Sequence, residues 1–290
     1  MRVLVAIPHY ANPNSGHEPA GQVHGSLSVD PTPRIEALTE CISSLHELFN
    51  PARCLINHGR KRAEWIEQTN TCKIEIVVCT THGLHLLGRL PVEPRYYRHH
   101  ETNAEPLFLG FECHKVLRDA LGGFDYYCYL EDDLILHDPW LFIKLRWFNA
   151  YVGDDKLLQP NRFEAGLNAP AAKTYVDGDL PDSETSSFQD VTDTPPLTAE
   201  VMGTRVLFQR TKNPHAGCFF LNERQMRHWT AQPWFLDRDV RFVGPLESAA
   251  TLGIMRTFRV YRSAPANADF LEVQHFGTNY LNQICPPKAD

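Results

Sequence analysis

Short apolar runs alternate with stretches of helical periodicity along this chain. Residues 2–8 (RVLVAIP) are apolar and rich in β-branched side chains, which predicts a buried parallel strand. Residues 34–49 carry aliphatic side chains at helical spacing, and Pro51 ends that predicted helix. Residues 73–80 (KIEIVVCT) and 126–130 (YYCYL) predict two further strands.

The same patterns predict the remaining elements. Helices are expected over residues 107–121, 140–151, 222–230 and 246–252, and strands over residues 200–211 and 258–261. Asn222 is of the residue type that caps a helix N-terminus. Residues 10–33 and 96–105 are polar and are expected to form loops. Residues 167–197 are rich in Asp, Pro, Ser and Thr, which indicates a loop-rich insertion within a single domain spanning residues 1–290.

Alternating strands and helices predict an α/β fold with three layers, in which helices cover both faces of a mostly parallel central sheet. Ligands of such sheets bind at the carboxyl ends of the strands. The loop after Pro8 and the acidic residues after Leu130 are therefore expected at the same edge of the sheet.

Composition narrows the class of protein. The formal net charge of −7 argues against a broad electrostatic grip on nucleic acid or on an anionic membrane. The first apolar run ends at Pro8, too early for a signal peptide, and no stretch approaches the roughly 20 apolar residues of a transmembrane segment. The eight cysteines include no CxxC pair and are interpreted as reduced core thiols, so we expect a cytoplasmic protein.

The most informative motif is the acidic triplet Glu131-Asp132-Asp133, directly after a buried strand. Adjacent carboxylates repel one another, and their pKa values rise unless a cation neutralises them. A divalent metal does so and leaves positions open for diphosphate oxygens. The other interpretation is a solvated turn that caps the next helix, a role that suits Asp138 before Pro139 better.

A strand at the first residues and a middle strand that ends in Glu131-Asp132-Asp133 together resemble the GT-A glycosyltransferases, which carry a DxD-type motif. The resemblance implies a GT-A fold and transfer of a sugar from a nucleotide-sugar donor. It implies that Asp133 binds the metal, and that Glu131 and Asp132 contact the ribose or the donor sugar. UDP is the nucleotide that the resemblance favours.

Three later residues extend this resemblance. Glu247 lies where the family places a carboxylate facing the acceptor, although a glutamate at a helix N-terminus is equally explained by the helix dipole. His275 matches a late histidine that supplies a further metal ligand, but it is one of 14 histidines. An imidazole ligand favours Mn²⁺ over Mg²⁺. Gly217 resembles a small residue beside the donor sugar, and its alternative is a packing role in a turn.

By the same resemblance, the nucleotide lies over the loop after the first strand, at Pro8, His9 and Tyr10. The metal neutralises charge as the nucleoside diphosphate leaves. If the reaction inverts the anomeric centre, Glu247 acts as general base on the acceptor hydroxyl; if it retains, Glu247 holds the acceptor. The acceptor is a glycan, a lipid-linked molecule or a small molecule.

A cationic side chain near the diphosphate would assist departure of the leaving group, and Arg34, Lys61 and Arg62 are the candidates. Their positions in the sequence do not distinguish among them.

Three other functions share parts of this pattern. A sugar-phosphate nucleotidyltransferase would need a basic loop after the first strand, whereas residues 8–25 contain no Lys or Arg. A metal-dependent phosphoester hydrolase would use clusters such as Asp177-Gly178-Asp179 with His99-His100. A non-catalytic carbohydrate-binding protein of the same fold is the third. A dinucleotide-dependent dehydrogenase is disfavoured because no GxGxxG follows the first strand.

Overall fold

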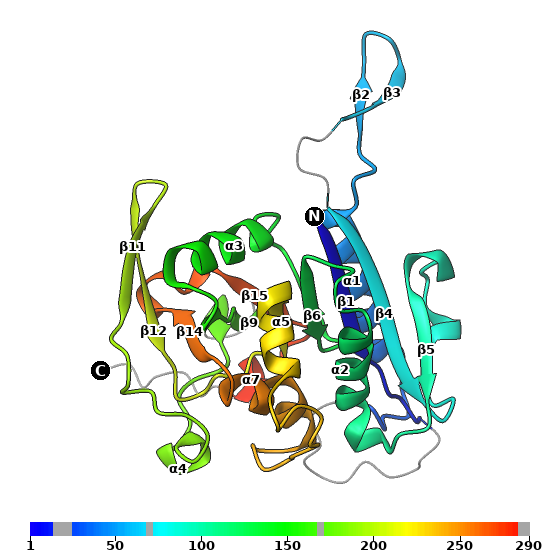
Figure 1. Ribbon diagram of the computed structural model, residues 1–290. Coiled ribbons are helices and arrows are strands. Elements are labelled where there is room, and N and C mark those ends of the chain that lie inside the picture. The colour runs from blue at the N-terminus through cyan, green and yellow to red at the C-terminus, as the bar shows by residue number, and fades with distance from the viewer. Residues whose placement is uncertain (14–24, 68–71, 167–170, 284–290) are drawn as a thin grey trace.

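A five-stranded sheet forms the centre of the molecule (Figure 1). The computed structural model describes residues 1–13, 25–67, 72–166 and 171–283. In spatial order the strands are β13 (Cys218–Asn222), β6 (Tyr126–Leu130), β1 (Arg2–Pro8), β4 (Lys73–Thr81) and β5 (Arg98–Thr102). All neighbours are parallel except β13, which runs antiparallel to β6. The predicted α/β class with a mostly parallel central sheet is confirmed.

Helices cover both faces of this sheet, as the alternation of strands and helices predicts. One face packs against α1 (Thr32–Phe49) and α3 (Leu141–Val152), and the other against α2 (Leu109–Asp119) and α5 (Glu223–Thr230). Side chains of β1 point alternately into the two cores, because successive residues of a strand face opposite sides. Burial on both faces explains why β1 and β6 consist of uninterrupted apolar runs.

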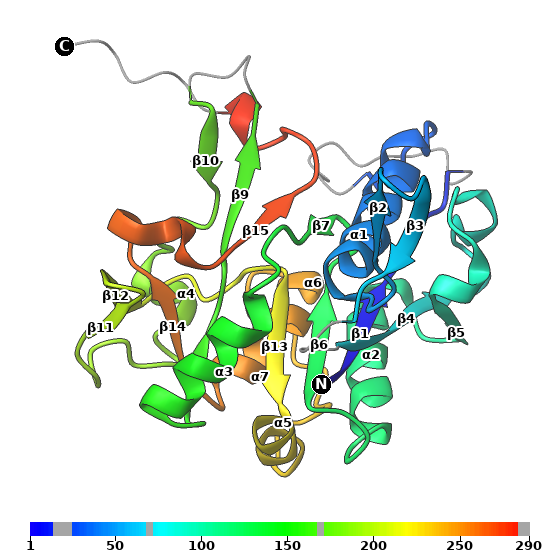
Figure 2. The same cartoon turned by 90° about the horizontal axis from the view of Figure 1, so that it is seen from above.

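Two smaller sheets lie beside the central one (Figure 2). The first contains β10 (Lys173–Tyr175), β9 (Asn161–Ala165), β15 (Glu272–His275) and β7 (Leu134–Ile135). The second contains β11 (Leu197–Val201), β12 (Thr204–Arg210), β14 (Arg259–Ser263) and β8 (Lys156–Leu158). A separate hairpin of β2 (Cys54–Asn57) and β3 (Arg62–Trp65) projects from the body.

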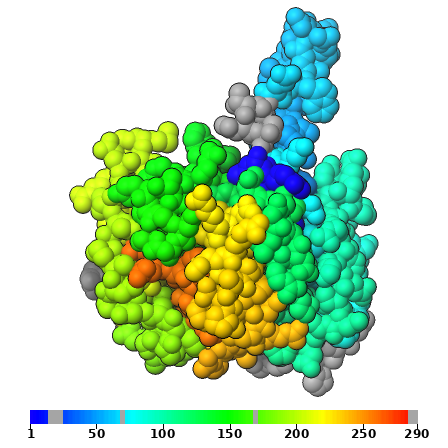
Figure 3. All heavy atoms as spheres, viewed as in Figure 1, coloured from blue at the N-terminus to red at the C-terminus, as the bar shows by residue number. Residues whose placement is uncertain are grey.

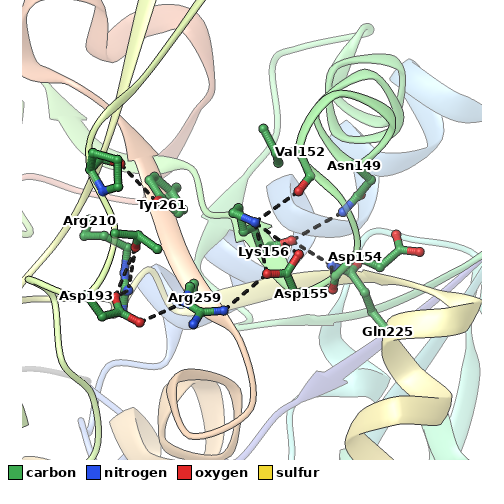
Figure 4. A network of polar contacts seen from close by, with 12 residues as sticks. Asn149, Val152, Asp154, Asp155, Lys156, Asp193, Arg210, Gln225, Arg259 and Tyr261 are labelled. Carbon is green, nitrogen blue, oxygen red and sulfur yellow. Dashed lines mark hydrogen bonds and ion pairs between the residues drawn. The ribbon is translucent and has the colours of Figure 1, made fainter.

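A polar network ties the second small sheet to the segment after α3 (Figure 4). Arg259 of β14 donates to Asp193 at 2.8 Å and to Asp155 at 3.3 Å. Asp193 also pairs with Arg210 of β12, and Lys156 pairs with Asp155 at 3.0 Å. Asp193 belongs to the predicted insertion over residues 167–197, so the end of that segment is anchored by two arginines.

The helix predictions agree with the structure. Helices α1, α2, α3 and α5 lie where periodicity places them, and Asn222 caps α5 in a reciprocal capping box with Gln225. The predicted helix over residues 246–252 lies within one helical segment, formed by α6 (Pro245–Glu247), a π-helical turn (Ser248–Leu252) and α7 (Gly253–Met255).

Some strand and loop predictions were wrong. Residues 98–102, predicted as loop, form the edge strand β5, whose polar side chains (RHHET) give no apolar pattern. The single strand predicted over residues 200–211 is the hairpin β11–β12, which turns at Met202 and Gly203 with positive φ at both. Within the predicted insertion, residues 173–175 form β10 and Asp182–Thr185 form α4, while residues 167–170 lie outside the described ranges.

Two further findings bear on the sequence predictions. No helix in the described part of the chain is long and apolar enough to span a bilayer. Seven cysteines lie within the described ranges; all are free, and only Cys54 among them is exposed.

Candidate functional site

The acidic triplet follows β6 at the carboxyl edge of the central sheet, next to the end of β1, as predicted. A tight turn holds it there: the Glu131 N–H donates to Gly217 at 2.9 Å, and the Leu134 N–H donates to Glu131 at 3.2 Å. Leu134 then starts β7, which belongs to a different sheet. The three carboxylates therefore sit where the chain leaves the central sheet.

Asp132 is fixed by two cationic or polar partners. Its carboxylate accepts from Arg34 Nη2 at 2.5 Å and lies 2.6 Å from His9 Nδ1. Burial alone would raise the pKa of Asp132, but Arg34 and His9 more than offset it and hold the pKa at about 2. Since both oxygens are engaged, Asp132 anchors the end of β1 and the start of α1 to the triplet.

His9 is completely buried beneath Asp132. The Leu86 N–H donates to its Nε2 at 3.2 Å, which leaves Nδ1 to carry the proton that Asp132 accepts. Burial lowers the pKa of His9 and favours this neutral form. Both ring nitrogens are thus used within the protein, so contact between His9 and a nucleotide would involve its backbone.

Asp133 differs from Asp132 because part of its carboxylate lacks a partner. Oδ2 lies 3.5 Å from Arg34 Nη1 and 3.6 Å from His275 Nε2. Oδ1 is buried and has no hydrogen-bond partner among the described residues. A buried carboxylate oxygen left in this way carries an uncompensated desolvation cost, which a bound cation would remove.

His275 reaches Asp133 through strand pairing. β15 pairs with β7 so that His275 lies opposite Leu134, the residue after Asp133. On its other side β15 runs parallel to β9, and His275 Nδ1 lies 2.8 Å from Glu164 Oε1. Glu164 is fully buried, and its second oxygen accepts from the Leu281 N–H at 2.7 Å. A carboxylate that binds Nδ1 turns the lone pair of Nε2 toward Asp133, the arrangement that orients metal-binding histidines.

These side chains fit part of a metal site. No group of three or more His, Cys, Asp or Glu side chains suited to a metal occurs in the described ranges. Asp133 and His275 supply two donors, one oxygen and one nitrogen, with Glu164 as the orienting carboxylate. A divalent ion held by two protein ligands takes its remaining ligands from water or from substrate phosphates. The donor set therefore suits an ion that binds together with a diphosphate.

Glu131 occupies the space left by a glycine. A Cβ on Gly217 would lie 2.4 Å from Glu131 Oε2, and Gly217 has φ of +64°. Arg162 Nη1 lies 3.7 Å from the same oxygen. Burial raises the pKa of Glu131 to about 8, helped by the nearby charges of Asp133 and Glu247. Gly217 was predicted to let a ligand approach the backbone; in this structure the close group is Glu131.

Glu247 lies at the start of the α6–α7 segment and is half-buried. Its carboxylate turns back over Gly244, where an added Cβ would lie 2.8 Å from Oε2. Its charge contributes to the raised pKa of Glu131, so the two carboxylates share one region of the site.

One cavity is lined by the triplet, and a second is connected to it through Arg162. The first contains all three acidic residues and is otherwise lined by Pro8, Tyr10, Ser26, Arg34, Pro106, Leu109 and Leu246. The second is more polar, and its lining includes Arg162, Tyr175, Asp177, Asp179 and Arg262. Arg162 belongs to the second cavity and contacts Glu131 of the first, so Glu131 lies between the two.

Of the three cations considered from the sequence, the structure brings only Arg34 to the site. Lys61 and Arg62 lie in the β2–β3 hairpin, which joins α1 to the start of β4 at the opposite edge of the sheet. The prediction that Lys61 or Arg62 could lie near the diphosphate was therefore wrong. Their order in the sequence does not indicate at which end of the sheet their segment lies.

Glu164 and Arg162 are site residues that the sequence analysis missed. The signal available was the pattern Asn161-Arg162-Phe163-Glu164-Ala165, which places two charged residues on one face of a short strand. Such a pattern is typical of an exposed edge strand. In the structure both charged residues are at least 94% buried, because β9 lies beside β15.

The chain was compared with known proteins. No protein-family model and no curated protein matches it. Among solved structures it is similar to S. aureus TarS residues 1–349, at 9% identity and a TM-score of 0.47 over 96% of this chain and 61% of that one. A longer S. aureus TarS structure matches at 11% identity and a TM-score of 0.45, over 97% and 38%. Mouse xyloside xylosyltransferase 1 in its apo form matches at 10% identity and a TM-score of 0.36, over 90% and 85%.

The chain thus spans less than two thirds of either TarS chain. At these identities and TM-scores the similar structures do not assign an activity to this chain. A function for it has to be inferred from the side chains of the site.

Proposed function

We propose that this protein is a metal-dependent glycosyltransferase of the GT-A type that uses a nucleotide-sugar donor, with UDP favoured. The observation that carries the proposal is the buried, unpartnered Oδ1 of Asp133, in a carboxylate whose other oxygen lies 3.6 Å from His275 Nε2. An acidic triplet with an oriented histidine at a strand's carboxyl end suits a diphosphate bound through a metal.

A divalent cation, Mn²⁺ in preference to Mg²⁺, would be held by Asp133 and His275, and would neutralise the charge that develops on the departing nucleoside diphosphate. Arg34 keeps Asp132 ionised and adds a fixed positive charge beside Asp133. Because Arg34 lies in the wall of the first cavity, it is the side chain we assign to the diphosphate. Tyr10, in the same wall, would lie against the nucleotide.

The acceptor would enter on the side of Glu247 and the second cavity. Arg162, Asp177, Asp179 and Tyr175 offer donors and acceptors of both signs, which suits a polyhydroxylated molecule such as a glycan. Glu247 would take the proton of the acceptor hydroxyl if the reaction inverts the anomeric centre, or would orient the acceptor if it retains. Glu131, between the cavities, would contact the donor sugar.

The test is calorimetric binding of UDP and of GDP, with and without Mn²⁺, to the wild type and to Asp133→Ala. Metal-dependent binding of one nucleotide that is lost in the variant is expected. Absence of binding to the folded wild type would overturn the proposal. Asp138→Ala is a matched control, because Asp138 lies outside the triplet in the segment that precedes α3, and this variant is expected to leave nucleotide binding intact.

Assays of product separate the alternatives. Pyrophosphate release from a nucleoside triphosphate and a sugar phosphate would indicate a nucleotidyltransferase instead. Phosphate release from a generic phosphoester would indicate a hydrolase, and sugar binding without nucleotide affinity would indicate a non-catalytic carbohydrate-binding protein.

A further inference from the structure

The β2–β3 hairpin stands clear of the rest of the molecule and does not contribute to the site (Figure 3). Between residues 51 and 67 every residue except Asn57 and Glu64 is exposed. Trp65 is 80% exposed and Ile56 is 64% exposed. A two-stranded ribbon is marginally stable alone, and exposed aromatic and aliphatic side chains of this size need a physical reason.

The strand register divides the hairpin into two faces. Directly paired residues of an antiparallel ribbon share a face. Cys54 pairs with Trp65 and Ile56 pairs with Ala63, so one face is wholly apolar. The other face carries the pairs Leu55–Glu64 and Asn57–Arg62 and is largely polar, with Arg60 and Arg62 both donating to Glu64 at 3.1 Å.

The charge of the hairpin is opposite to that of the chain. The segment 53–67 contains four cations, namely Arg53, Arg60, Lys61 and Arg62, against two carboxylates, in a chain of formal net charge −7. Three of the cations are consecutive and lie at or beside the turn that forms the tip. A projecting tip holds this positive charge away from the acidic body, where it is available to a surface of opposite sign.

We propose that the β2–β3 hairpin docks the protein on an anionic lipid surface. The apolar face, led by Trp65 and Ile56, enters the boundary between headgroups and acyl chains, and the basic turn of residues 60–62 binds the acidic headgroups. Tryptophan, aliphatic and basic side chains together on one protruding element match the chemistry of that boundary. A second copy of the hairpin is a poorer partner, since it would bring a basic turn of the same sign.

The geometry also gives the docked orientation. The hairpin joins the end of α1 to the start of β4, at the edge of the sheet where β1 begins (Figure 1). The acidic triplet lies at the opposite edge, where β6 ends. Docking through the hairpin therefore localises the protein and leaves the site facing away from that lipid surface.

The experiment measures cosedimentation of the full chain with vesicles of phosphatidylcholine alone or mixed with phosphatidylserine. Two variants probe the hairpin: Ile56→Ser/Trp65→Ser removes the apolar face, and Arg60→Ser/Lys61→Ser/Arg62→Ser removes the basic turn. Met202→Ser and Arg224→Ser are matched controls, because these side chains are 89% and 88% exposed on other elements. Circular dichroism verifies that each variant is folded.

We expect the wild type to bind only the phosphatidylserine vesicles, and tryptophan emission to shift to the blue on binding. The triple variant should lose about 100-fold in affinity, since each cation near an anionic surface contributes roughly fivefold. Both controls should bind like the wild type. No binding by the wild type, or undiminished binding by both hairpin variants, would overturn the proposal. A dimer in sedimentation velocity that Ile56→Ser/Trp65→Ser dissociates would show instead that a second copy covers this face.

Discussion

His275 and Glu164 are 111 residues apart in the sequence, yet His275 Nδ1 lies 2.8 Å from the Glu164 carboxylate on the neighbouring parallel strand. Glu164 has no access to solvent, and its second oxygen accepts a hydrogen bond from the Leu281 N–H. The pair therefore fixes the orientation of the imidazole before any ligand arrives. This preorganisation is the feature that most separates His275 from a histidine buried for packing alone.

Replacing Glu164 tests this relationship. Glu164→Gln keeps the shape and the acceptor for the Leu281 N–H but weakens the grip on His275 Nδ1, so affinity for Mn²⁺ should fall about 10- to 100-fold. Calorimetric titration of Mn²⁺ in the presence of UDP measures it. Glu272→Gln, on the same small sheet but at the surface with Lys173, serves as control. Unchanged Mn²⁺ affinity in Glu164→Gln would mean that Glu164 only supports packing.

Replacing Glu247 tests the acceptor side of the proposed function. Glu247→Gln should lower kcat by about 100-fold or more, because a positioned base contributes at least that much, while nucleotide binding stays intact. Initial rates with a UDP-sugar and a suitable acceptor, together with calorimetry of UDP, measure the two quantities separately. Glu200→Gln, at an exposed position of β11, is the control. If UDP binding is lost along with activity, Glu247 belongs to the donor side.

Gly217 and Gly203 form a matched pair for a test of stability. Both have positive φ, but an added Cβ meets Glu131 at 2.4 Å in one case and nothing within 4 Å in the other. Gly203→Ala should cost about 1 kcal/mol of unfolding free energy from backbone strain, and Gly217→Ala about 2–4 kcal/mol, since the clash adds to it. Urea unfolding measures both.

Most of the difference between these two glycine variants should disappear when Glu131 is shortened, because only a contact of 3.0 Å with Leu134 Cδ1 then remains. In a Glu131→Ala background, the unfolding free energy lost in Gly217→Ala is expected to approach that lost in Gly203→Ala. Equal costs of the two substitutions in the wild-type background would show that Glu131 moves aside freely.

His114 makes stability depend on pH. It is buried among aromatic rings including Phe111 and Trp229, and its Nε2 donates to Ala249 at 2.9 Å. Burial lowers its pKa from 6.5 to about 4, so protonation favours the unfolded chain. The contribution of neutral His114 to stability is present above pH 6.5 and is lost as the pH falls toward 4. Between pH 7 and pH 5 the unfolding free energy falls by about 2 kcal/mol for this reason.

Urea unfolding at pH 7 and at pH 5 measures this loss. His114→Gln keeps a donor for Ala249. The difference between the unfolding free energies at pH 7 and at pH 5 should be about 2 kcal/mol smaller in this variant than in the wild type. His9 contributes with the same sign, because burial lowers its pKa too, so part of the pH dependence should remain. His228→Gln, at an exposed position on α5, should leave the difference unchanged. A pH dependence identical in wild type and His114→Gln would contradict the assignment.

Local pattern in the sequence determined a large part of this protein. The apolar runs at residues 2–8 and 126–130, the periodicity of α1 and the Asn222 cap all depend on neighbours within a few residues, and each lies where it is predicted. The alternation of strands and helices determined the α/β class. Because β1 and β6 are parallel, the loop after Pro8 and the triplet lie at the same edge of the sheet, where the rule for ligand binding at carboxyl ends of strands predicts them.

Only the tertiary structure decided which side chains meet there. Arg34 reaches Asp132 across 98 residues, and His275 lies between Asp133 and Glu164 because β15 pairs with both β7 and β9. Pairing register over such separations is set by packing of whole sheets, and no window of the sequence contains it. For the same reason β5 and β9, whose polar residues resemble loops or exposed edges, became recognisable as strands only once their neighbouring strands were known.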